Sequence, residues 1–528
     1  MTPDVPSNPS LESDRKRAKT LLRRCRSGDA EAVSVLIKYH PRFKGAHRDT
    51  VIDQAKLADA QLAVARSYGY PSWPSWKQYV ETRRMDLAGQ AVAMVKAACS
   101  NDVRRARVLL EADPALAGFD LWSACVTGEV DVVRRELGRD PAAASRRGGA
   151  LAWTPLEYAC FSRLIRAEPA RAAGIEAVVG VLLDAGADPN AYHEHTWEGD
   201  AYRETPLFGA AGIANHAGIT ERLLAAGADP DEGYGEPNPR DPERSPWGIE
   251  SLYHASEFTD PDSLRLLLAA EPHPVRISYC LGRVLDFADC ETRVRAYLSA
   301  GADPDFVVPW FAKGTRHFHK AVMLGRSPAV IQAMIAAGAD VNTPNGEGVS
   351  PLEEALLHGH DALADILRRH GASEPQAAAV NPVDRPDVMC WATARNDIAL
   401  VERLLDQGAD IEGQSSINDG PALHWAAWRG RSEIVRLLVE RGADIYYEGR
   451  YDAAALGMAI HGSAHCVDPE AGSTMHRYLP AEHGDYPAIV QLLIERGATL
   501  PKSIWGGSDA VQDVLRQHGV PDPSSSPA

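Results

Sequence analysis

The segment Leu182-Leu183-Asp184-Ala185-Gly186-Ala187-Asp188-Pro189-Asn190 decides the fold, because altered copies of it recur down the chain. Its glycine reappears at seven later positions: Gly227, Gly301, Gly338, Gly371, Gly408, Gly442 and Gly497. Most gaps between these glycines are 33 to 41 residues, and the gap of 74 before Gly301 is twice 37, so one unit there has lost its glycine. A period in this range indicates small units stacked side by side rather than one enclosed core.

Each unit opens with a second signature upstream of the glycine. Three clear copies precede apolar helical patterns: Thr154-Pro155-Leu156, Thr205-Pro206-Leu207 and Ser350-Pro351-Leu352. Thr or Ser can cap a helix, and Pro suits its first position because the missing N–H would be unpaired anyway. The later glycine supplies the positive φ that ends a second helix. Each unit is therefore predicted to be a helix, a tight turn, a second helix and an extended finger loop.

This pattern resembles that of ankyrin-repeat proteins. The best unit, residues 420–444, reads GPALHWAAWRGRSEIVRLLVERGAD, with Pro421-Ala422 in place of Thr-Pro. The resemblance implies an all-α ankyrin-repeat solenoid made of helix-turn-helix units with finger loops. We expect about eleven units within residues 86–502, the first two degenerate and the last interrupted by an insertion at 462–485.

The segments that flank the repeats have a different character. Residues 11–85 are predicted to form a small helical N-terminal cap, and they resemble a segment found on some bacterial ankyrin-repeat proteins. We expect residues 1–10 to be disordered, and residues 503–528 to hold a C-terminal capping helix and a disordered tail.

Composition restricts the class of protein. With 55 Lys and Arg against 72 Asp and Glu, the formal net charge is −17, which argues against general nucleic-acid binding. No run of 18 apolar residues is present, and residues 1–19 lack the apolar segment of a secretory signal. The eight cysteines are scattered without a CxxC pair, as expected for thiols in a reducing compartment. We therefore expect a cytoplasmic protein that binds neither membrane nor nucleic acid.

Motifs for catalysis or cofactor binding are absent, and no cofactor is predicted. His193-Glu194-His195 does not match a zinc-protease motif and is expected to lie in a solvent-exposed finger. Three other histidines, His254, His319 and His424, occupy the fourth place of the unit signature. The resemblance implies that they are structural and hydrogen-bond neighbouring loops.

The last unit carries the weak candidates for a metal site, His461, His465 and Cys466. His461 and His465 are four residues apart and would share one face of a helix, and imidazole with thiolate suits zinc. Gly462 and Ser463, however, suggest that the helix ends there, and no second ligand pair has a recognised spacing. We favour an ordered or mobile binding loop over a metal centre.

Groove-facing and finger residues are the candidates for binding. Large aromatics on exposed loops mark contact surfaces, although they could instead pack onto neighbouring fingers. In an ankyrin-like stack, Arg395, Trp428 and His461 face the concave groove. The aromatic finger candidates are Tyr192, Trp197, Tyr202, Tyr234, Trp247, Trp310 and Phe311.

Glu257 and Asp286 support one enzymatic hypothesis. They come from consecutive units, and two neighbouring carboxylates in a partly closed groove could act as an acid and a base. The simpler interpretation is that each forms a local salt bridge, with Arg283 or Arg265 as the partner.

The function predicted from these observations is a cytoplasmic scaffold that recognises a protein or peptide in its concave groove. The alternative is an enzyme or small-molecule binder whose pocket is closed by the long aromatic fingers. Its acid/base chemistry, of a hydrolase, lyase or cyclase type, would use Glu257 and Asp286.

Overall fold

The computed structural model describes residues 9–43, 45–70, 73–100, 102–197, 200–231, 250–287, 289–307, 314–375, 381–414, 420–449, 453–465 and 484–520. Regular structure in these ranges is mostly helical, as predicted. The two named strands, β1 (His193–Trp197) and β2 (Asp200–Glu204), form one antiparallel hairpin. None of the described helices combines the length and apolar character that a membrane crossing requires.

The N-terminal segment is a helical unit with its own core. Buried Asp14 accepts hydrogen bonds from the Tyr68 hydroxyl (2.8 Å) and from Trp76 Nε1 (3.0 Å), so its carboxylate is satisfied inside the protein. The rings of Tyr68 and Trp76 stack at 4.4 Å. Its elements are α1 (Leu11–Arg26), α2 (Ala30–Tyr39), η1 (Pro41–Phe43), α3 (Arg48–Gln54), α4 (Leu57–Ser67) and α5 (Trp73–Arg83).

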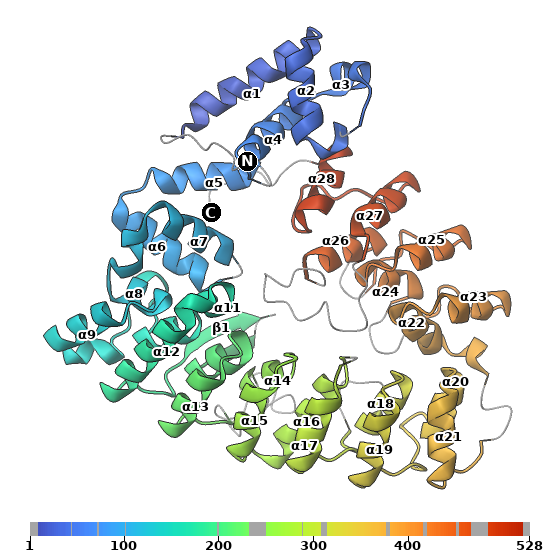
Figure 1. Cartoon of the computed structure of the whole chain (residues 1–528). Helices are drawn as coiled ribbons and strands as arrows, with labels where there is room; N and C mark the ends of the chain where they lie inside the picture. Colours follow the sequence, from blue (N-terminus) through green and yellow to red (C-terminus); the bar gives the residue numbers. More distant parts are fainter. Residues whose placement is uncertain are drawn as a thin grey trace.

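The first helices of the repeats follow one another along the inner side of the molecule (Figure 1). In the fourth unit a π-helical segment, η5, takes this place. These inner elements are α6 (Leu87–Ala98), α8 (Leu121–Thr127), α10 (Pro155–Cys160), η5 (Phe208–Ile213), α14 (Glu250–Ala255), α16 (Pro274–Val284), α18 (His317–Met323), α20 (Pro351–Leu357), α22 (Pro386–Ala394), α24 (Ala422–Trp428) and α26 (Ala455–His465).

The second helices form the outer layer. They are α7 (Val103–Ala112), α9 (Val130–Arg139), α12 (Pro169–Asp184), α13 (Ala217–Ala225), α15 (Asp262–Ala269), α17 (Glu291–Ser299), α19 (Pro328–Ala336), α21 (Asp361–Arg369), α23 (Ile398–Asp406), α25 (Ser432–Glu440) and α27 (Tyr486–Glu495). The final helix is α28 (Asp509–Gln517), and the short connecting elements are η2 (Pro114–Gly118), η3 (Pro141–Ser145), η4 (Gly149–Leu151), α11 (Leu164–Ala167) and η8 (Pro382–Asp384).

Capping explains where these helices begin and end. Ser350 accepts a hydrogen bond from the backbone N–H of Glu353, and the Glu353 carboxylate accepts one from the Ser350 N–H, which completes a capping box at α20. Gly442, just after α25, has φ +92°, as the period predicted. In the unit without a glycine, Glu271 takes this left-handed conformation instead, with φ +54°.

The apolar core of the repeats is divided in two. One cluster runs from Ala91 to Leu367, and a second runs from Met323 to Val520. The second cluster contains Met323, Leu324 and Leu357 together with the side chains of α22. The ends of α18 and α20 therefore form a seam at which the two halves of the array join.

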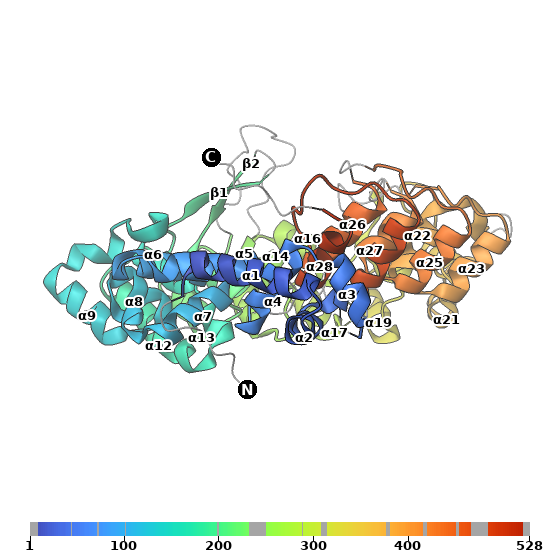
Figure 2. The ribbon, with the colours of Figure 1, turned by 90° about the horizontal axis from the view of Figure 1, so that it is seen from above.

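The stack of repeats bends into a ring, and its two ends meet (Figure 1). Arg66 of α4 forms an ion pair with Asp513 of α28, with 2.6 Å between Nη2 and Oδ2. Asp513 is buried and also pairs with Arg516 at 3.1 Å. Seen from above, the ring is flat and the β1–β2 hairpin stands out of its plane (Figure 2). The groove of the predicted solenoid is thus the inner face of a ring.

Candidate functional site

Three tryptophans gather at α22 and α24 on the inner side of the ring. The Trp391 and Trp425 rings lie 5.1 Å apart, the Trp425 and Trp428 rings lie 6.2 Å apart, and the Arg429 guanidinium lies 4.3 Å from the Trp428 ring. The indole nitrogens of Trp425 and Trp428 are buried without a hydrogen-bond partner. Trp428 was predicted from its repeat position, whereas its tryptophan neighbours were not singled out.

Four basic side chains, here called the seam cluster, lie where the two apolar cores join: Arg326, His358, His360 and Arg395. Arg395 is the C-cap of α22, yet its Nη1 reaches the Met323 carbonyl at 3.0 Å. The same nitrogen lies 3.4 Å from His358 Nδ1. His360 Nε2 lies 3.2 Å from the Met323 carbonyl oxygen. Arg395 thus spans from the ninth unit to the seventh.

Burial lowers the pKa of every member of the seam cluster. It brings the pKa of His358 to about 3 and that of His360 to about 4, and the Arg395 charge acts in the same direction on both. It lowers the pKa of Arg395 to about 10 and also lowers that of Arg326. At neutral pH the two histidines are therefore neutral, and the two arginines carry the positive charge.

Glu257 and Asp286 lie together, joined by one guanidinium. Arg283 Nε donates to Glu257 Oε1 at 2.9 Å, and Arg283 Nη1 lies 3.3 Å from Asp286 Oδ2. Lys320 Nζ lies 2.7 Å from Asp286 Oδ1, and His254 Nδ1 lies 3.3 Å from Glu257 Oε1. The three ion pairs of Arg283 and Lys320 are well buried, so this is the salt-bridged arrangement with Arg283 that the sequence offered as the simpler interpretation.

Lys320 is the unusual member of this group. It is buried, and its ammonium also donates to the Gly282 carbonyl at 2.7 Å. Burial lowers its pKa, against the opposing effect of the Asp286 carboxylate. Sequence reasoning missed Lys320, although it directly follows the signature residue His319. A catalytic role for Glu257 and Asp286 stays a prediction.

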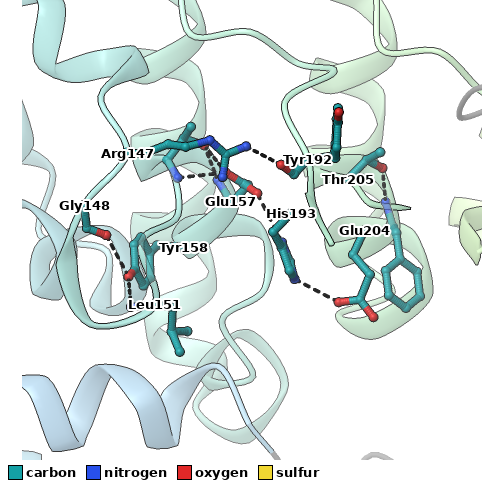
Figure 3. Close-up of polar contacts among 11 residues, drawn as sticks. Arg147, Gly148, Leu151, Glu157, Tyr158, Tyr192, His193, Glu204 and Thr205 are labelled. Atoms are coloured by element: carbon teal, nitrogen blue, oxygen red, sulfur yellow. Dashed lines mark hydrogen bonds and ion pairs between the residues drawn. The ribbon is translucent and has the colours of Figure 1, made fainter. Parts of the chain in front are cut away.

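His193 forms a clamp between the hairpin and the third unit (Figure 3). Its Nδ1 lies 3.1 Å from Glu157 Oε1, its Nε2 lies 3.0 Å from Glu204 Oε2, and its ring stacks on Trp153 at 3.9 Å. Burial disfavours the charged ring, but the hydrogen bonds to the two carboxylates outweigh it and raise the pKa of His193. The expectation of a solvent-exposed His193 was therefore wrong, because its two carboxylate partners come together only when the hairpin folds back onto α10.

Only part of the predicted aromatic finger surface lies within the described residues. Tyr192 is exposed; the Arg203 guanidinium lies 4.6 Å from its ring, and Arg147 donates to its carbonyl. Trp197 and Tyr202 belong to β1 and β2, but their side chains are not described. Tyr234, Trp247, Trp310 and Phe311 lie outside the described residues. This part of the binding surface stays a prediction.

The signature histidines mostly follow the expectation. His319 Nε2 lies 3.2 Å from the Val349 carbonyl oxygen and His424 Nε2 lies 3.0 Å from that of Tyr447, so each bonds a neighbouring loop. His254 instead contacts Glu257.

The last unit differs from its prediction in one respect. Helix α26 continues through Gly462 to His465, so Gly462 does not end the helix. A Cβ at Gly462 would lie 2.1 Å from the Trp428 carbonyl oxygen, and the glycine is therefore required for close packing of α26 on α24. His461 is exposed on this helix, while the His465 side chain and Cys466 are outside the described part. Within that part, no group of three or more His, Cys, Asp or Glu side chains is placed to hold a metal ion.

Comparison with known proteins agrees with the repeat geometry. A family profile described as "Ankyrin repeats (many copies)" matches residues 389–462. Mouse (Mus musculus) B-cell lymphoma 3 protein homolog is 30% identical over 158 residues, covering 29% of this chain and 33% of that protein. Ankyrin repeat protein nuc-2 of Neurospora crassa is 26% identical over 182 residues, covering 34% of this chain and 14% of that protein.

A third relative, the palmitoyltransferase AKR1 of Lachancea kluyveri, is 26% identical over 152 residues, covering 22% of this chain and 20% of that protein. The chain thus spans a third or less of the length of these curated relatives. The paired helices, their terminal glycines and these matches together show that the chain contains ankyrin repeats.

Proposed function

We propose that this protein is a binding scaffold that holds a protein or peptide partner against the inner face of its ring. Ankyrin repeats suggest such a role in general. The observation that carries the proposal here is the cluster of tryptophan and arginine side chains at α22 and α24, where the buried indole N–H groups of Trp425 and Trp428 lack partners. Tryptophan and arginine are the residues that most often dominate binding interfaces.

The finer parts of the proposal rest on sequence. The cysteines of the described part form no disulfide, which supports a reducing compartment such as the cytoplasm. The resemblance of residues 11–85 to segments of bacterial ankyrin-repeat proteins supports a bacterial origin. The chain is proposed to consist of a cap (11–85), a repeat array (86–502) and a C-terminal capping segment (503–528).

Site-specific photo-crosslinking tests the scaffold role. A benzoylphenylalanine replaces Trp428 at the inner end of α24, and in a matched variant it replaces exposed Glu440 at the end of α25 on the outer layer. After irradiation in native cell extract, the inner probe is expected to yield a discrete crosslinked protein or peptide that the outer probe does not. Equal crosslinking from both positions would contradict binding at the inner face.

The alternative function is an enzyme or small-molecule binder that uses Glu257 and Asp286. The observation in its favour is buried Lys320. Its amine lies beside the Asp286 carboxylate, and burial lowers its pKa. Glu257→Gln and Asp286→Asn should abolish turnover of any substrate found. Because each substitution removes a buried partner of Arg283, each variant must first be shown to be folded by circular dichroism. Undiminished turnover by both folded variants would exclude these residues as acid and base.

A further inference from the structure

Two arginines of the seam cluster are buried without a counter-ion. Arg326 is 4% exposed and Arg395 is half-buried. Across the residues that the structure describes, no carboxylate lies within 4.0 Å of either guanidinium. This contrasts with Arg283, one unit before Arg326, which contacts both Glu257 and Asp286.

The partners that these arginines do have are neutral. Arg395 donates to the Met323 carbonyl, and Arg326 Nη2 donates to the next carbonyl, that of Leu324, at 3.0 Å. The Cys290 thiol is a further hydrogen-bond partner of Arg326. Two guanidinium groups therefore converge on the C-terminal end of α18, where the partial negative charge of the helix end offsets only part of their charge.

Each of the two arginines has an N–H group without a hydrogen-bond partner. Arg395 Nη2 and Arg326 Nε are both buried and have no hydrogen-bond partner. Buried donors are almost always satisfied in native proteins, and an unpaired one costs free energy. The Arg326 charge also disfavours the charged form of Arg395, while the Asp397 carboxylate acts in the opposite direction.

The neighbouring acidic groups do not neutralise the positive charge of the two arginines. Asp286 and Asp289 act on Arg326, and Asp397 acts on Arg395, only at longer range than an ion pair. Glu354 approaches the cluster, with Oε2 3.5 Å from His358 Nε2, but burial raises its pKa to about 7, so it is only partly ionised at neutral pH. The seam thus holds two positive charges, neutral imidazoles and unfilled donors.

We propose that Arg326 and Arg395 form a binding site for an oxyanion, the carboxylate or phosphate group of a ligand held on the inner face. The inference deepens the proposed scaffold function and names the chemistry of the part of the partner that docks at the seam. A guanidinium presents a planar fork of N–H donors that matches both kinds of oxyanion. The site joins the two apolar cores, so an anion here would also hold the two halves of the array together.

Direct anion titration of the purified full-length protein tests this site. Sodium phosphate and sodium acetate are titrated at constant ionic strength, with chloride as the balancing ion, and binding is followed by calorimetry and by the shift in melting temperature. Wild-type protein is expected to bind phosphate or acetate and to melt higher with it than in chloride. Stabilisation by phosphate alone assigns the site to phosphate groups, and stabilisation by acetate alone assigns it to carboxylates.

Variants of the two arginines give the controls. Arg395→Gln and Arg326→Gln are each expected to abolish the anion-dependent shift, while Arg395→Lys, which keeps the charge but loses the fork, should weaken binding at least tenfold. Arg403→Gln, an exposed position on α23 with the same change in charge, should leave the shift intact. In chloride buffer without phosphate or acetate, Arg395→Gln should melt no lower than wild type, because it removes a half-buried charge that lacks a counter-ion.

The proposal is overturned if neither anion stabilises the wild type beyond chloride, or if the shift persists in both glutamine variants. A lower melting temperature of Arg395→Gln in chloride buffer, with an unchanged response to phosphate and acetate, would assign Arg395 a purely structural role as the cap of α18. Because the titration uses no protein partner, its failure is distinct from failure of the crosslinking test of the scaffold.

Discussion

At the scale of single residues, this protein places charges in buried positions and satisfies them in different ways. His193 is held between Glu157 and Glu204, and Arg283 between Glu257 and Asp286. Arg326 and Arg395 have only neutral partners. His193 and Arg283 thus each lie between two carboxylates, whereas Arg326 and Arg395 do not, and this contrast is the basis of the proposed oxyanion site.

The pH dependence of the His193 clamp follows from its raised pKa. A group whose pKa is raised on folding contributes stability that is fully present below its unfolded pKa, about 6.5 for histidine, and is lost as pH rises through the folded value. The charged groups that face His193 are Glu157, Glu204 and, through Glu157, Arg147 at 3.7 Å. We expect His193→Gln to cost the hairpin about 2 kcal/mol below pH 6, and much less at alkaline pH.

Hydrogen exchange measures this effect. At each pH, exchange of the β1 amides is compared between wild type and His193→Gln, so that the intrinsic exchange rate cancels. The ratio of protection should fall from roughly thirtyfold below pH 6 toward unity as pH rises, using about 1.4 kcal/mol for each tenfold change. A ratio that does not change with pH would contradict a charged His193.

Glu271 provides a second test at this scale. It stands where eight other units have glycine, and its φ of +54° is unfavourable for a residue with a Cβ. Glu271→Gly should stabilise the protein by about 0.5–1 kcal/mol, since the relief of strain exceeds the extra flexibility of glycine in the unfolded chain. Thermal and urea denaturation measure the change. Glu271→Ala keeps the strain, so an equal gain from alanine would show that the backbone conformation is not the cause.

The contacts of a residue could be predicted from the sequence where the residue occupies a fixed place in the repeated unit. His319 and His424 occupy a fixed place in the unit, and their bonds to the next loop follow from that place. His193 and Arg395 could not be placed in this way. Their partners, Glu204 in a hairpin and Met323 two units away, are set by packing between segments that no local pattern relates.

At the scale of elements, close contact between helices depends on particular glycines. A Cβ at Gly174 in α12 would lie 2.6 Å from the carbonyl oxygen of Gly128, the residue that ends α8. The glycines that follow the outer helices could be predicted from their period. The role of Gly174 was not, because nothing in a helical pattern shows which face meets a neighbouring backbone.

Two substitutions in α12 separate packing from helix propensity. Gly174→Ala should destabilise the protein by about 2–3 kcal/mol, because α12 and the end of α8 must move apart. Gly180→Ala should stabilise it by about 0.5–1 kcal/mol, since its new methyl group would lie an ordinary 3.6 Å from Arg222 Nη1. Urea unfolding of both variants measures the difference. If Gly174→Ala gained stability as Gly180→Ala does, the close approach of the two backbones would be refuted.

At the scale of the whole molecule, the repeat array closes on itself. The sequence predicted the stacked units, but not the closure, because the ring depends on a small rotation at every unit and on a contact between residues 447 positions apart. Closure brings the N-terminal cap against α28 and turns the groove into an inner face. Burial raises the pKa of Asp513, and the Arg66, Arg516 and His40 charges offset this effect at the junction.

Small-angle X-ray scattering of wild type and Arg66→Glu tests this closed ring, the central claim, most directly. The substitution places a second negative charge beside buried Asp513 and should open the junction. Wild-type scattering should match the closed ring, and Arg66→Glu should increase both the radius of gyration and the largest dimension. Arg15→Glu, the same change at an exposed position of α1, should leave both unchanged. Wild-type scattering that fits only an open arc, or identical curves for wild type and Arg66→Glu, would contradict the ring.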